Sequence, residues 1–473
     1  MRIKNALILL AIIISIAINL ITFKNGHGWS GDSAGYILQS QAIKNNSFHN
    51  LKYHIERTDY TLNYPWGYPL LLTAVIHHFE TDINFLKMYT YGFFVISFIF
   101  IYLYFKDDDE EKALLTILIM SVNPYFWIYK NHILADLPHL LFAYIALFLI
   151  QVIYVQKKKF LNDHVSNVCI GSAIFLAYSM RGQSIVLLPT LFIVQLFTYK
   201  KQTMHLNNIL RHLLPYATFT GLVIVQYAVS PIGATTYIHQ YHYRTLINTV
   251  AYNFVYYTHA WNALFSKILI VSRISKIVLG ASLMCCMLGI TSNMKSHRLS
   301  IAFIVTNIAL LAVTPFHDGF RYLIPLIPIF FYFSIKGFDL LLSSFYHKYR
   351  IALYYSITAL FVVISCISIM VLSFNDYKEK SIMTGPYEKE SQEMFEYIKK
   401  NTHVSDIITF WQSRVMLLYS GRDSVVIKRV GDLTRADYVV YYEDGDDQLD
   451  LDSLSSLNLD LKFENKHFKI FKI

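Results

Sequence analysis

Residues 6–23 read ALILLAIIISIAINLITF, an apolar stretch without charged residues that follows Arg2 and Lys4. A helix needs about 20 apolar residues to cross the roughly 30 Å hydrocarbon core of a bilayer, so this stretch is long enough to span a membrane. It is similar to the apolar part of a signal peptide, but it is long and no clear small-residue cleavage site follows it. We therefore expect an uncleaved first membrane helix.

The composition of the whole chain also indicates a membrane protein. Of its 473 residues, 55% are hydrophobic and 15% are charged, well below the roughly 25% charged residues of an ordinary soluble domain. This is too little polar surface to cover a water-soluble globule, which argues against a cytosolic enzyme, a disordered protein and a secreted disulfide scaffold. The four cysteines lie in apolar runs without metal-ligand spacing, so we expect them to be small core residues.

Ten further apolar runs give about eleven expected transmembrane helices and an α-helical polytopic fold. They are Phe85–Phe105, Ala113–Tyr129, Leu137–Val155, Val168–Ser184, Ile185–Tyr199, Leu213–Val229, Ile268–Ile290, Leu299–Phe316, Tyr322–Leu342 and Ile351–Phe374. Lysine and arginine gather in the short loops on the side of the N-terminus, which places the N-terminus in the cytoplasm. An odd number of spans then places the C-terminal tail outside.

The composition changes after Phe374. Residues 375–473 contain 18 acidic and 14 basic side chains, so they carry −4 of the net charge of +9, and residues 1–374 carry +13. Glu388–Lys400 has the apolar spacing of a helix, whereas Asp406–Trp411, Ser424–Lys428 and Tyr438–Tyr442 are typical of short strands. We expect a transmembrane domain over residues 1–374, with a long outer loop over 24–84, and a small extracytoplasmic α/β domain over 375–473.

Ionisable residues next to membrane spans are usually functional or paired, and here they gather at span ends on the expected outer side. The long outer loop begins with Asp32, at the start of an expected helix that places Tyr36 about one turn away. An ordinary N-cap is the simpler interpretation of Asp32 taken alone. Farther along, the aromatic and proline run Tyr64–Pro69 leads into Leu70–Phe79, which predicts an interfacial helix or an ordinary aromatic belt.

A second acidic residue lies between the third and fourth spans. Asp136 follows Lys130 and His132 and starts the returning helix, with Pro138 in a position that suits a first helical turn. An N-cap and a snorkelling lysine would explain this segment by itself. Two aspartates near aromatic and basic residues on one face are harder to explain in that way, so we expect Asp32 and Asp136 to be functional.

Two arginines stand at outer turns. Arg181 lies between the fifth and sixth spans, and Arg321 lies before the tenth span in a segment that also contains His317 and Tyr322. The guanidinium fork fits phosphate oxygens, so these arginines are suited to hold a phosphate or diphosphate. The alternative is that each arginine pairs with a nearby carboxylate, such as Asp318.

In their order along the chain these residues resemble the GT-C superfamily of integral-membrane glycosyltransferases. The nearer relatives are the bacterial aminoarabinose transferases, the protein O-mannosyltransferases and the Rgt-type sugar transferases. The residues that carry the resemblance are Asp32, Tyr36 and Ala42 in the first outer loop, the run Tyr64–Pro69, Asp136 with Pro138, the Arg-Tyr-Leu-x-Pro element Arg321–Pro325, and the tail segment Trp411–Arg422. Many members have two adjacent acidic residues in the first loop, whereas here Ser33 follows Asp32.

The resemblance implies a GT-C-like fold and a polyprenyl-phosphate-linked sugar donor. Transfer to a hydroxyl or phosphate of a lipid, glycan or protein acceptor is then expected at the extracytoplasmic face, by an inverting displacement. Asp32 is the expected base and Asp136 a second catalytic carboxylate. The expected substrate-binding residues are Tyr36, Tyr64, Lys130, His132, Arg181, His317, Arg321 and Tyr322. We expect a multi-pass protein of a bacterial inner or plasma membrane, with the lipid bilayer and no nucleic acid as partner.

No cofactor is certain from the sequence. No constellation of His, Cys and Asp demands a metal, and the departure at Ser33 leaves a divalent metal open.

Two other functions fit the same outline. A transporter or flippase of lipid-linked saccharides predicts polar residues at mid-span and matched broken helices in two halves, of which the sequence has only the isolated Gln226 and Asn307. A non-enzymatic scaffold that displays the tail domain does not explain why the ionisable residues lie on one side.

Overall fold

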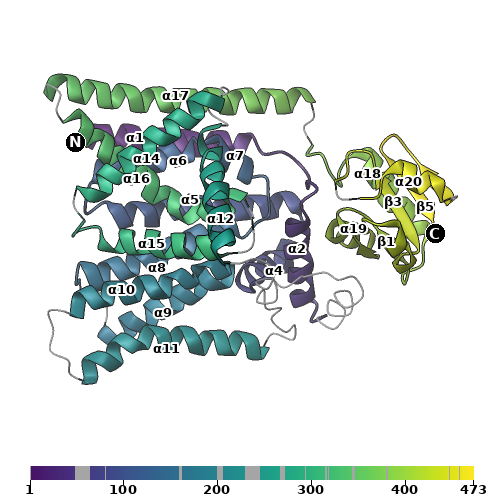
Figure 1. The fold of residues 1–473 in the computed structure, drawn as a ribbon, viewed down its shortest axis with the longest axis horizontal. Helices are drawn as coiled ribbons and strands as arrows, with labels where there is room; N and C mark the ends of the chain where they lie inside the picture. Colours follow the sequence, from purple (N-terminus) through teal and green to yellow (C-terminus); the bar gives the residue numbers. More distant parts are fainter. Residues whose placement is uncertain are drawn as a thin grey trace.

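The computed structural model describes residues 2–47, 64–79, 81–158, 162–199, 206–229, 246–266, 272–292, 294–314, 317, 319–343, 347–379, 382–446, 448–457 and 459–473. They form a bundle of helices and a separate small domain that contains the sheet (Figure 1). The N-terminus lies at one end of the bundle and the C-terminal domain lies beyond the other, which we call the domain end (Figure 1).

The helical part contains short 3₁₀ segments (η2, η4) and a π-helical turn (η1) as well as α-helices. Its elements are α1 (Arg2–Ile21), α2 (Gly31–Lys44), α4 (Gly67–Phe79), α5 (Ile83–Phe105), α6 (Glu110–Ser121), α7 (Pro124–Tyr129), α8 (Asp136–Ile150), η1 (Gln151–Val155), α9 (Asp163–Met180), η2 (Gly182–Val186), α10 (Leu187–Tyr199), α11 (Leu206–Val229), α12 (Leu246–Trp261), α13 (Ala263–Ser266), α14 (Ser272–Thr291), α15 (Arg298–Val313), η4 (Gly319–Leu326), α16 (Ile327–Leu342) and α17 (His347–Glu379).

Most of the expected membrane spans are present as apolar helices. In the described part of the chain, six helices are long and apolar enough to cross a membrane: Ile83–Phe105, Asp136–Val155, Leu210–Val229, Arg273–Thr291, Gly319–Leu342 and Ala352–Phe374. Three shorter apolar helices, Asn5–Ile21, Gly182–Phe197 and Arg298–Val313, coincide with three more expected spans. The α-helical polytopic membrane fold is confirmed, although a count of eleven spans is not.

The expected span Ala113–Tyr129 is wrong as a single helix. Helix α6 ends at Ser121, and α7 begins at Pro124 after an N-cap in which the Asn123 side chain accepts a hydrogen bond from the Tyr125 amide. The residue before a proline is biased away from helical backbone angles, which accounts for the break at Asn123.

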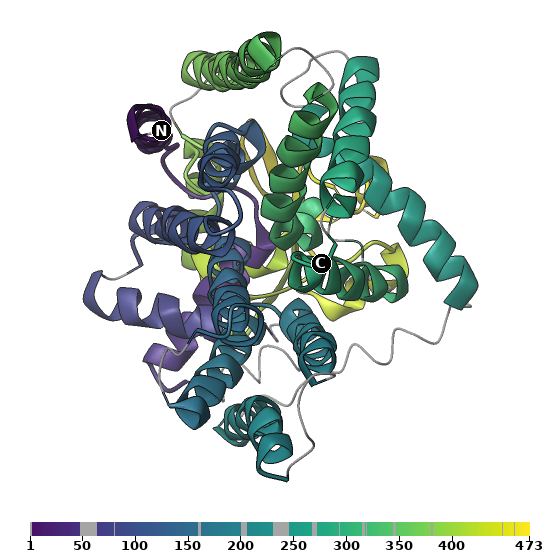
Figure 2. The same cartoon turned by 90° about the vertical axis from the view of Figure 1, so that its left-hand side faces the viewer.

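Apolar side chains cover the outside of the bundle. Only 11% of the apolar window of α17 is buried inside the protein, and Leu360, Val363 and Ile367 on this helix are exposed. Figure 2, which looks along the bundle, places α17 at its edge. A contiguous apolar surface of this kind suits lipid and not water. The chain is therefore an integral, multi-pass membrane protein.

Charged residues also hold together the end of the bundle opposite the domain end. The loop between α5 and α6 is tied to three other segments: Asp107 pairs with Lys158 at 2.8 Å, Asp108 pairs with Lys336 at 2.7 Å, and the Asp108 carboxylate lies 3.6 Å from His297. This ionic cluster is separate from the domain end of the bundle, because its members lie at the ends of α5, α15 and α16 that point away from the C-terminal domain.

The C-terminal domain is an α/β domain, as expected. Its elements are α18 (Lys389–Asn401), β1 (Ile407–Thr409), α19 (Ser413–Ser420), β2 (Asp423–Val425), η5 (Val430–Arg435), β3 (Tyr438–Tyr442), α20 (Leu451–Ser456), β4 (Asp460–Glu464) and β5 (Phe468–Lys472). The sheet order is β2-β1-β3-β5-β4, with β1 parallel to both of its neighbours and β5 antiparallel to both of its own. The expected boundary at Phe374 coincides with the end of a candidate span, although helix α17 continues to Glu379.

Candidate active site

Helix α2 carries Asp32 at the domain end of the bundle. The N-cap of α2 is Ser30, whose side chain accepts a hydrogen bond from the Ser33 amide at 3.3 Å. The interpretation of Asp32 as an N-cap is therefore wrong. Asp32 lies in the first turn, where the positive end of the helix dipole favours a carboxylate, and its side chain is turned toward other elements.

Asp136 is the first residue of α8 and its side chain is fully buried, with 0% exposure. The N-cap position belongs to Ala135, which makes no side-chain capping bond, so the capping interpretation does not hold for Asp136 either. A buried carboxylate is strongly disfavoured unless it is paired and hydrogen-bonded. The environment of Asp136 therefore has to supply cations.

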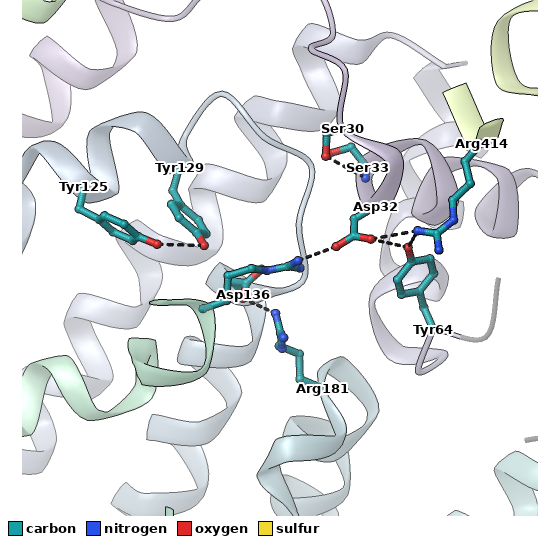
Figure 3. A network of polar contacts seen from close by, with 10 residues as sticks. Ser30, Asp32, Ser33, Tyr64, Tyr125, Tyr129, Asp136, Arg181 and Arg414 are labelled. Atoms are coloured by element: carbon teal, nitrogen blue, oxygen red, sulfur yellow. Dashed lines mark hydrogen bonds and ion pairs between the residues drawn. The ribbon is translucent and has the colours of Figure 1, made fainter. Parts of the chain in front are cut away.

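Arg321 of η4 joins the two aspartates. Its Nη1 lies 2.5 Å from Oδ2 of Asp32, and its Nε lies 3.1 Å from Oδ2 of Asp136. Arg181, at the turn between α9 and η2, donates to the other Asp136 oxygen. Figure 3 shows Asp136 between Arg181 on one side and Asp32 on the other. Four of the residues singled out from the sequence thus converge in one ion-pair network.

The other side of Asp32 faces the C-terminal domain. Oδ1 of Asp32 accepts a hydrogen bond from the Tyr64 hydroxyl at 2.7 Å. The same oxygen forms an ion pair with Nη1 of Arg414, on α19, at 3.0 Å. The same Arg414 nitrogen donates to the Tyr64 hydroxyl oxygen. Tyr36, buried on α2, packs against Tyr64, with the two rings tilted by 35° and their centroids 4.1 Å apart.

These contacts keep Asp32 ionised. Burial by itself raises the pKa of Asp32, but the charge and hydrogen bond of Arg321, the Tyr64 hydroxyl and the charge of Arg414 together lower it to about 2. Burial, with Asp32 adding to it, raises the pKa of the Tyr64 hydroxyl well above its usual value. Tyr64 therefore remains a hydrogen-bond donor to the carboxylate at neutral pH.

The remaining residues singled out from the sequence lie around this network or away from it. The guanidinium of Arg181 lies over the Tyr322 ring, 5.0 Å from its centroid. His132 follows α7, and its pKa is lowered to about 4 by burial, Lys87 and Arg321, so the ring is neutral at pH 7. The Nε2 of His317 lies 2.6 Å from Oδ1 of Asn253, a residue of α12. None of these contacts tests a substrate-binding role.

Lys130 contacts the residues that follow α1. Its ammonium donates to the backbone oxygen of Thr22 at 2.6 Å and lies 4.1 Å from the Trp127 ring centroid. The side chain has 0% exposure, so it does not snorkel toward water as one interpretation proposed.

Arg414 was not among the residues singled out, although the segment Trp411–Arg422 that contains it was. The sequence offers only its position three residues after Trp411, which does not predict a contact with Asp32. Asp318, the expected carboxylate partner of the arginines, lies outside the described residues. The observed partners of Arg321 are Asp32 and Asp136.

A divalent metal does not fit the residues that meet here. Within the described ranges, no group of three or more His, Cys, Asp and Glu side chains is placed to hold an ion. Arg321 lies between the two carboxylates, where a cation bridging them would have to bind. The guanidinium already supplies the positive charge that two facing carboxylates require.

Comparison with solved structures identifies the architecture. One similar structure is an Archaeoglobus fulgidus oligosaccharyltransferase, crystallised as a complex with Zn and sulfate. The match has 11% identity and a TM-score of 0.61, and it covers 92% of this chain and 68% of the oligosaccharyltransferase. The oligosaccharyltransferase AglB of that organism, in complex with an inhibitory peptide and a dolichol-phosphate, matches with 11% identity and a TM-score of 0.58, over 92% of this chain and 69% of its own. ArnT from Cupriavidus metallidurans, bound to undecaprenyl phosphate, matches 98% of both chains with 10% identity and a TM-score of 0.53.

This chain shares the fold of these oligosaccharyltransferase and ArnT structures. The expected GT-C-like fold is thereby confirmed, and the resemblance in layout extends over nearly the whole of ArnT, including its C-terminal part. No protein-family model matches the sequence, and no curated protein matches it. At 9–11% identity the likeness lies in the fold, and the site residues have to be argued from their own chemistry.

Proposed function

We propose that this protein is a membrane glycosyltransferase that moves a sugar from a polyprenyl-phosphate-linked donor to a hydroxyl or phosphate of an acceptor. The observation that carries the proposal is the bridge formed by Arg321 between Asp32 and Asp136 at the domain end of the bundle. It brings a carboxylate suited to proton abstraction and guanidinium groups suited to a phosphate into direct contact. The GT-C fold, shared with a protein bound to undecaprenyl phosphate, supports the same chemistry.

The proposed reaction is a single displacement with inversion at the anomeric carbon. The acceptor oxygen forms a bond to this carbon as the bond to the donor phosphate oxygen breaks. The acceptor proton passes to Asp32, and the bonding electrons leave with the polyprenyl phosphate. Negative charge grows on the phosphate during this step, and fixed cations such as Arg321 and Arg181 lower the barrier by stabilising it.

The ion pairs of Asp32 imply an order of binding. Both of its carboxylate oxygens accept contacts, and with a pKa of about 2 the group is a weak base in this state. A donor phosphate that pairs with Arg321 competes with Asp32 for the same guanidinium. Loss of this cation frees Oδ2 of Asp32 and raises the basicity of the carboxylate. We therefore propose that the donor binds before the acceptor.

Asp136 and Arg181 form the buried part of the site. The side chain of Asp136 is fully buried and that of Arg181 is 9% exposed, compared with 33% for Asp32. We assign to Asp136 the role of orienting Arg321 and Arg181. The acceptor then approaches from the more exposed side, where Asp32 lies.

The site is proposed to face the extracytoplasmic side. The basic loops expected in the cytoplasm belong with the opposite end of the bundle, where Lys158 and Lys336 pair with the loop between α5 and α6. With the N-terminus in the cytoplasm, the C-terminal domain and the two aspartates lie outside, in a bacterial inner or plasma membrane. The acceptor is accordingly an envelope lipid, glycan or protein.

The test is a transfer assay with the purified protein in lipid nanodiscs. A panel of polyprenyl-phosphate sugars is supplied with an envelope extract as the source of acceptor, and released polyprenyl phosphate is measured. We expect release with at least one donor and loss of release in Asp32→Asn. Movement of an intact lipid-linked sugar across vesicles, without cleavage of its sugar–phosphate bond, would instead identify a flippase.

A further inference from the structure

We propose that the C-terminal domain is part of the active site, and that its Arg414 is a positioning residue that keeps the Asp32 carboxylate directed at the substrate. The proposal deepens the proposed function, because it rests on Asp32 as the base. Two sets of contacts support it: those that attach the domain to the segment that precedes α2, and those that Arg414 makes.

The segment before α2 is bound to the start of the C-terminal domain. Asn25 and Ile382 form a parallel β-bridge, and the Met383 amide donates to the Asn25 oxygen at 2.9 Å. Buried Lys87 of α5 donates to the Gly26 oxygen at 2.7 Å from the other side. The chain leading to Asp32 is therefore fixed between the bundle and the domain.

Trp29, three residues before Asp32, packs among the aromatic side chains of the domain. The centroid of its ring lies 5.5–6.4 Å from the ring centroids of Phe395, Phe410, Trp411, Tyr442 and Phe468. Ala34, on α2 itself, belongs to the same buried cluster. Because aromatic residues bury large areas, this contact couples the first turn of α2 to the position of the domain.

Helix α19 brings Arg414 to Asp32 through this interface. A Cβ atom on Gly31 would lie 2.8 Å from Oε1 of Gln412, which shows how closely the residues before α19 approach the start of α2. Nη1 of Arg414 lies 3.0 Å from Oδ1 of Asp32 and also contacts the Tyr64 hydroxyl, while the Arg414 side chain is 23% exposed (Figure 3). The contact joins residues 382 positions apart in the chain.

The two arginines at Asp32 contact different oxygens. Arg321 contacts Oδ2 and Arg414 contacts Oδ1, so a phosphate that takes over Arg321 leaves the contacts of Oδ1 in place. Arg414 and Tyr64 then keep the carboxylate oriented, with Oδ2 available to an acceptor hydroxyl. A nearby cation also favours the ionised carboxylate, which is the form that accepts a proton.

The experiment compares Arg414→Gln and Arg414→Lys with Arg429→Gln, which removes an exposed arginine of the same domain. Two titrations are measured on the full-length protein in nanodiscs. One is the pH dependence of kcat for sugar transfer. The other is the carboxylic-acid infrared band assigned to Asp32 by its absence in Asp32→Asn, which requires no turnover. Far-UV circular dichroism and limited proteolysis show whether each variant is folded.

Removal of the Arg414 charge is expected to move both titrations of Asp32 upward by roughly 0.5–1 pH unit, because Arg321 remains as one of the two cations. Arg414→Lys is expected to recover at least half of the shift, and Arg429→Gln to give none. A folded Arg414→Gln protein in which Asp32 titrates as in the wild type overturns the proposal. An infrared shift in a protein that cleaves no lipid-linked sugar supports the role of Arg414 and refutes the proposed function.

Discussion

Asp136→Asn tests the reasoning about the buried half of the ion-pair network. The substitution keeps the size of the side chain and removes the negative charge that faces Arg181 and Arg321. Since Asp136 is fully buried and Arg181 is 9% exposed, water can do little to stabilise the arginine charge that is left without its partner. Breaking a buried ion pair from one side costs about 3–5 kcal/mol. Arg321 keeps its contact with Asp32, so we expect a loss near the lower value.

The assay for this loss is equilibrium unfolding of the solubilised protein, followed by tryptophan fluorescence. Asp107→Asn is the matched control, because its pair with Lys158 has side chains that are 40% and 60% exposed, and such surface pairs contribute at most about 1 kcal/mol. The double variant Asp136→Asn with Arg181→Gln removes both charges and is expected to be more stable than Asp136→Asn alone. Wild-type stability of Asp136→Asn, or additive losses in the double variant, would refute the reasoning.

Three further predictions concern the base, a buried histidine in the segment before α2, and metal ions. Asp32→Asn is expected to lower kcat for sugar transfer by about 10²–10⁴-fold without raising KM for the donor; unimpaired transfer would remove Asp32 from the role of base. Burial, His132 and Lys87 lower the pKa of His27 from 6.5 to about 3, so the folded protein keeps this residue neutral. Stability that depends on neutral His27 is fully present above pH 6.5 and falls by about 1.4 kcal/mol per pH unit as the pH drops toward 3. The free energy of unfolding should therefore change less between pH 6 and pH 5 in His27→Gln than in the wild type. An equal change in the two proteins would contradict the lowered pKa of His27. Transfer is expected to continue after dialysis against EDTA, because Arg321 lies between the two carboxylates; loss of activity that Mn²⁺ or Zn²⁺ restores would show that a metal enters the site.

The sequence predicts the membrane fold because each helix needs a minimum number of apolar residues to cross the bilayer. Apolar runs of about 20 residues predict helices that cross a bilayer, and the described spans agree with those runs. The break before Pro124 was also available from the sequence, since proline restricts the residue that precedes it. In the tail, the alternating residues of Asp460–Glu464 were a usable signal for β4, whereas Phe468–Lys472 breaks the alternation at Phe471; neither β4 nor β5 is among the strands expected from the sequence.

The sequence predicts only in part that the charged residues of the site come together. The topology expected from the sequence places Asp32, Asp136, Arg181 and Arg321 on one side of the membrane, and the structure brings all four into one network. The sequence does not say that Arg321 bridges both aspartates, because that depends on side-chain geometry between residues 185 and 289 positions apart.

Two further features of the site required the three-dimensional structure. Ser30 and Asp32 are equally good capping residues by type. Only the structure shows that Ser30 caps α2, which leaves the Asp32 side chain to contact the arginines of the network. The contact of Arg414 with Asp32 depends on how the C-terminal domain packs on the segment before α2, and no local pattern encodes that packing.

The most direct test of the account is a cryo-electron microscopy structure of the protein with a bound polyprenyl phosphate. The account predicts that the phosphate lies within hydrogen-bond distance of Arg321, with Oδ2 of Asp32 released from that guanidinium and Oδ1 still paired with Arg414. A phosphate bound at the opposite end of the bundle, beside Lys336 and Asp108, would contradict it.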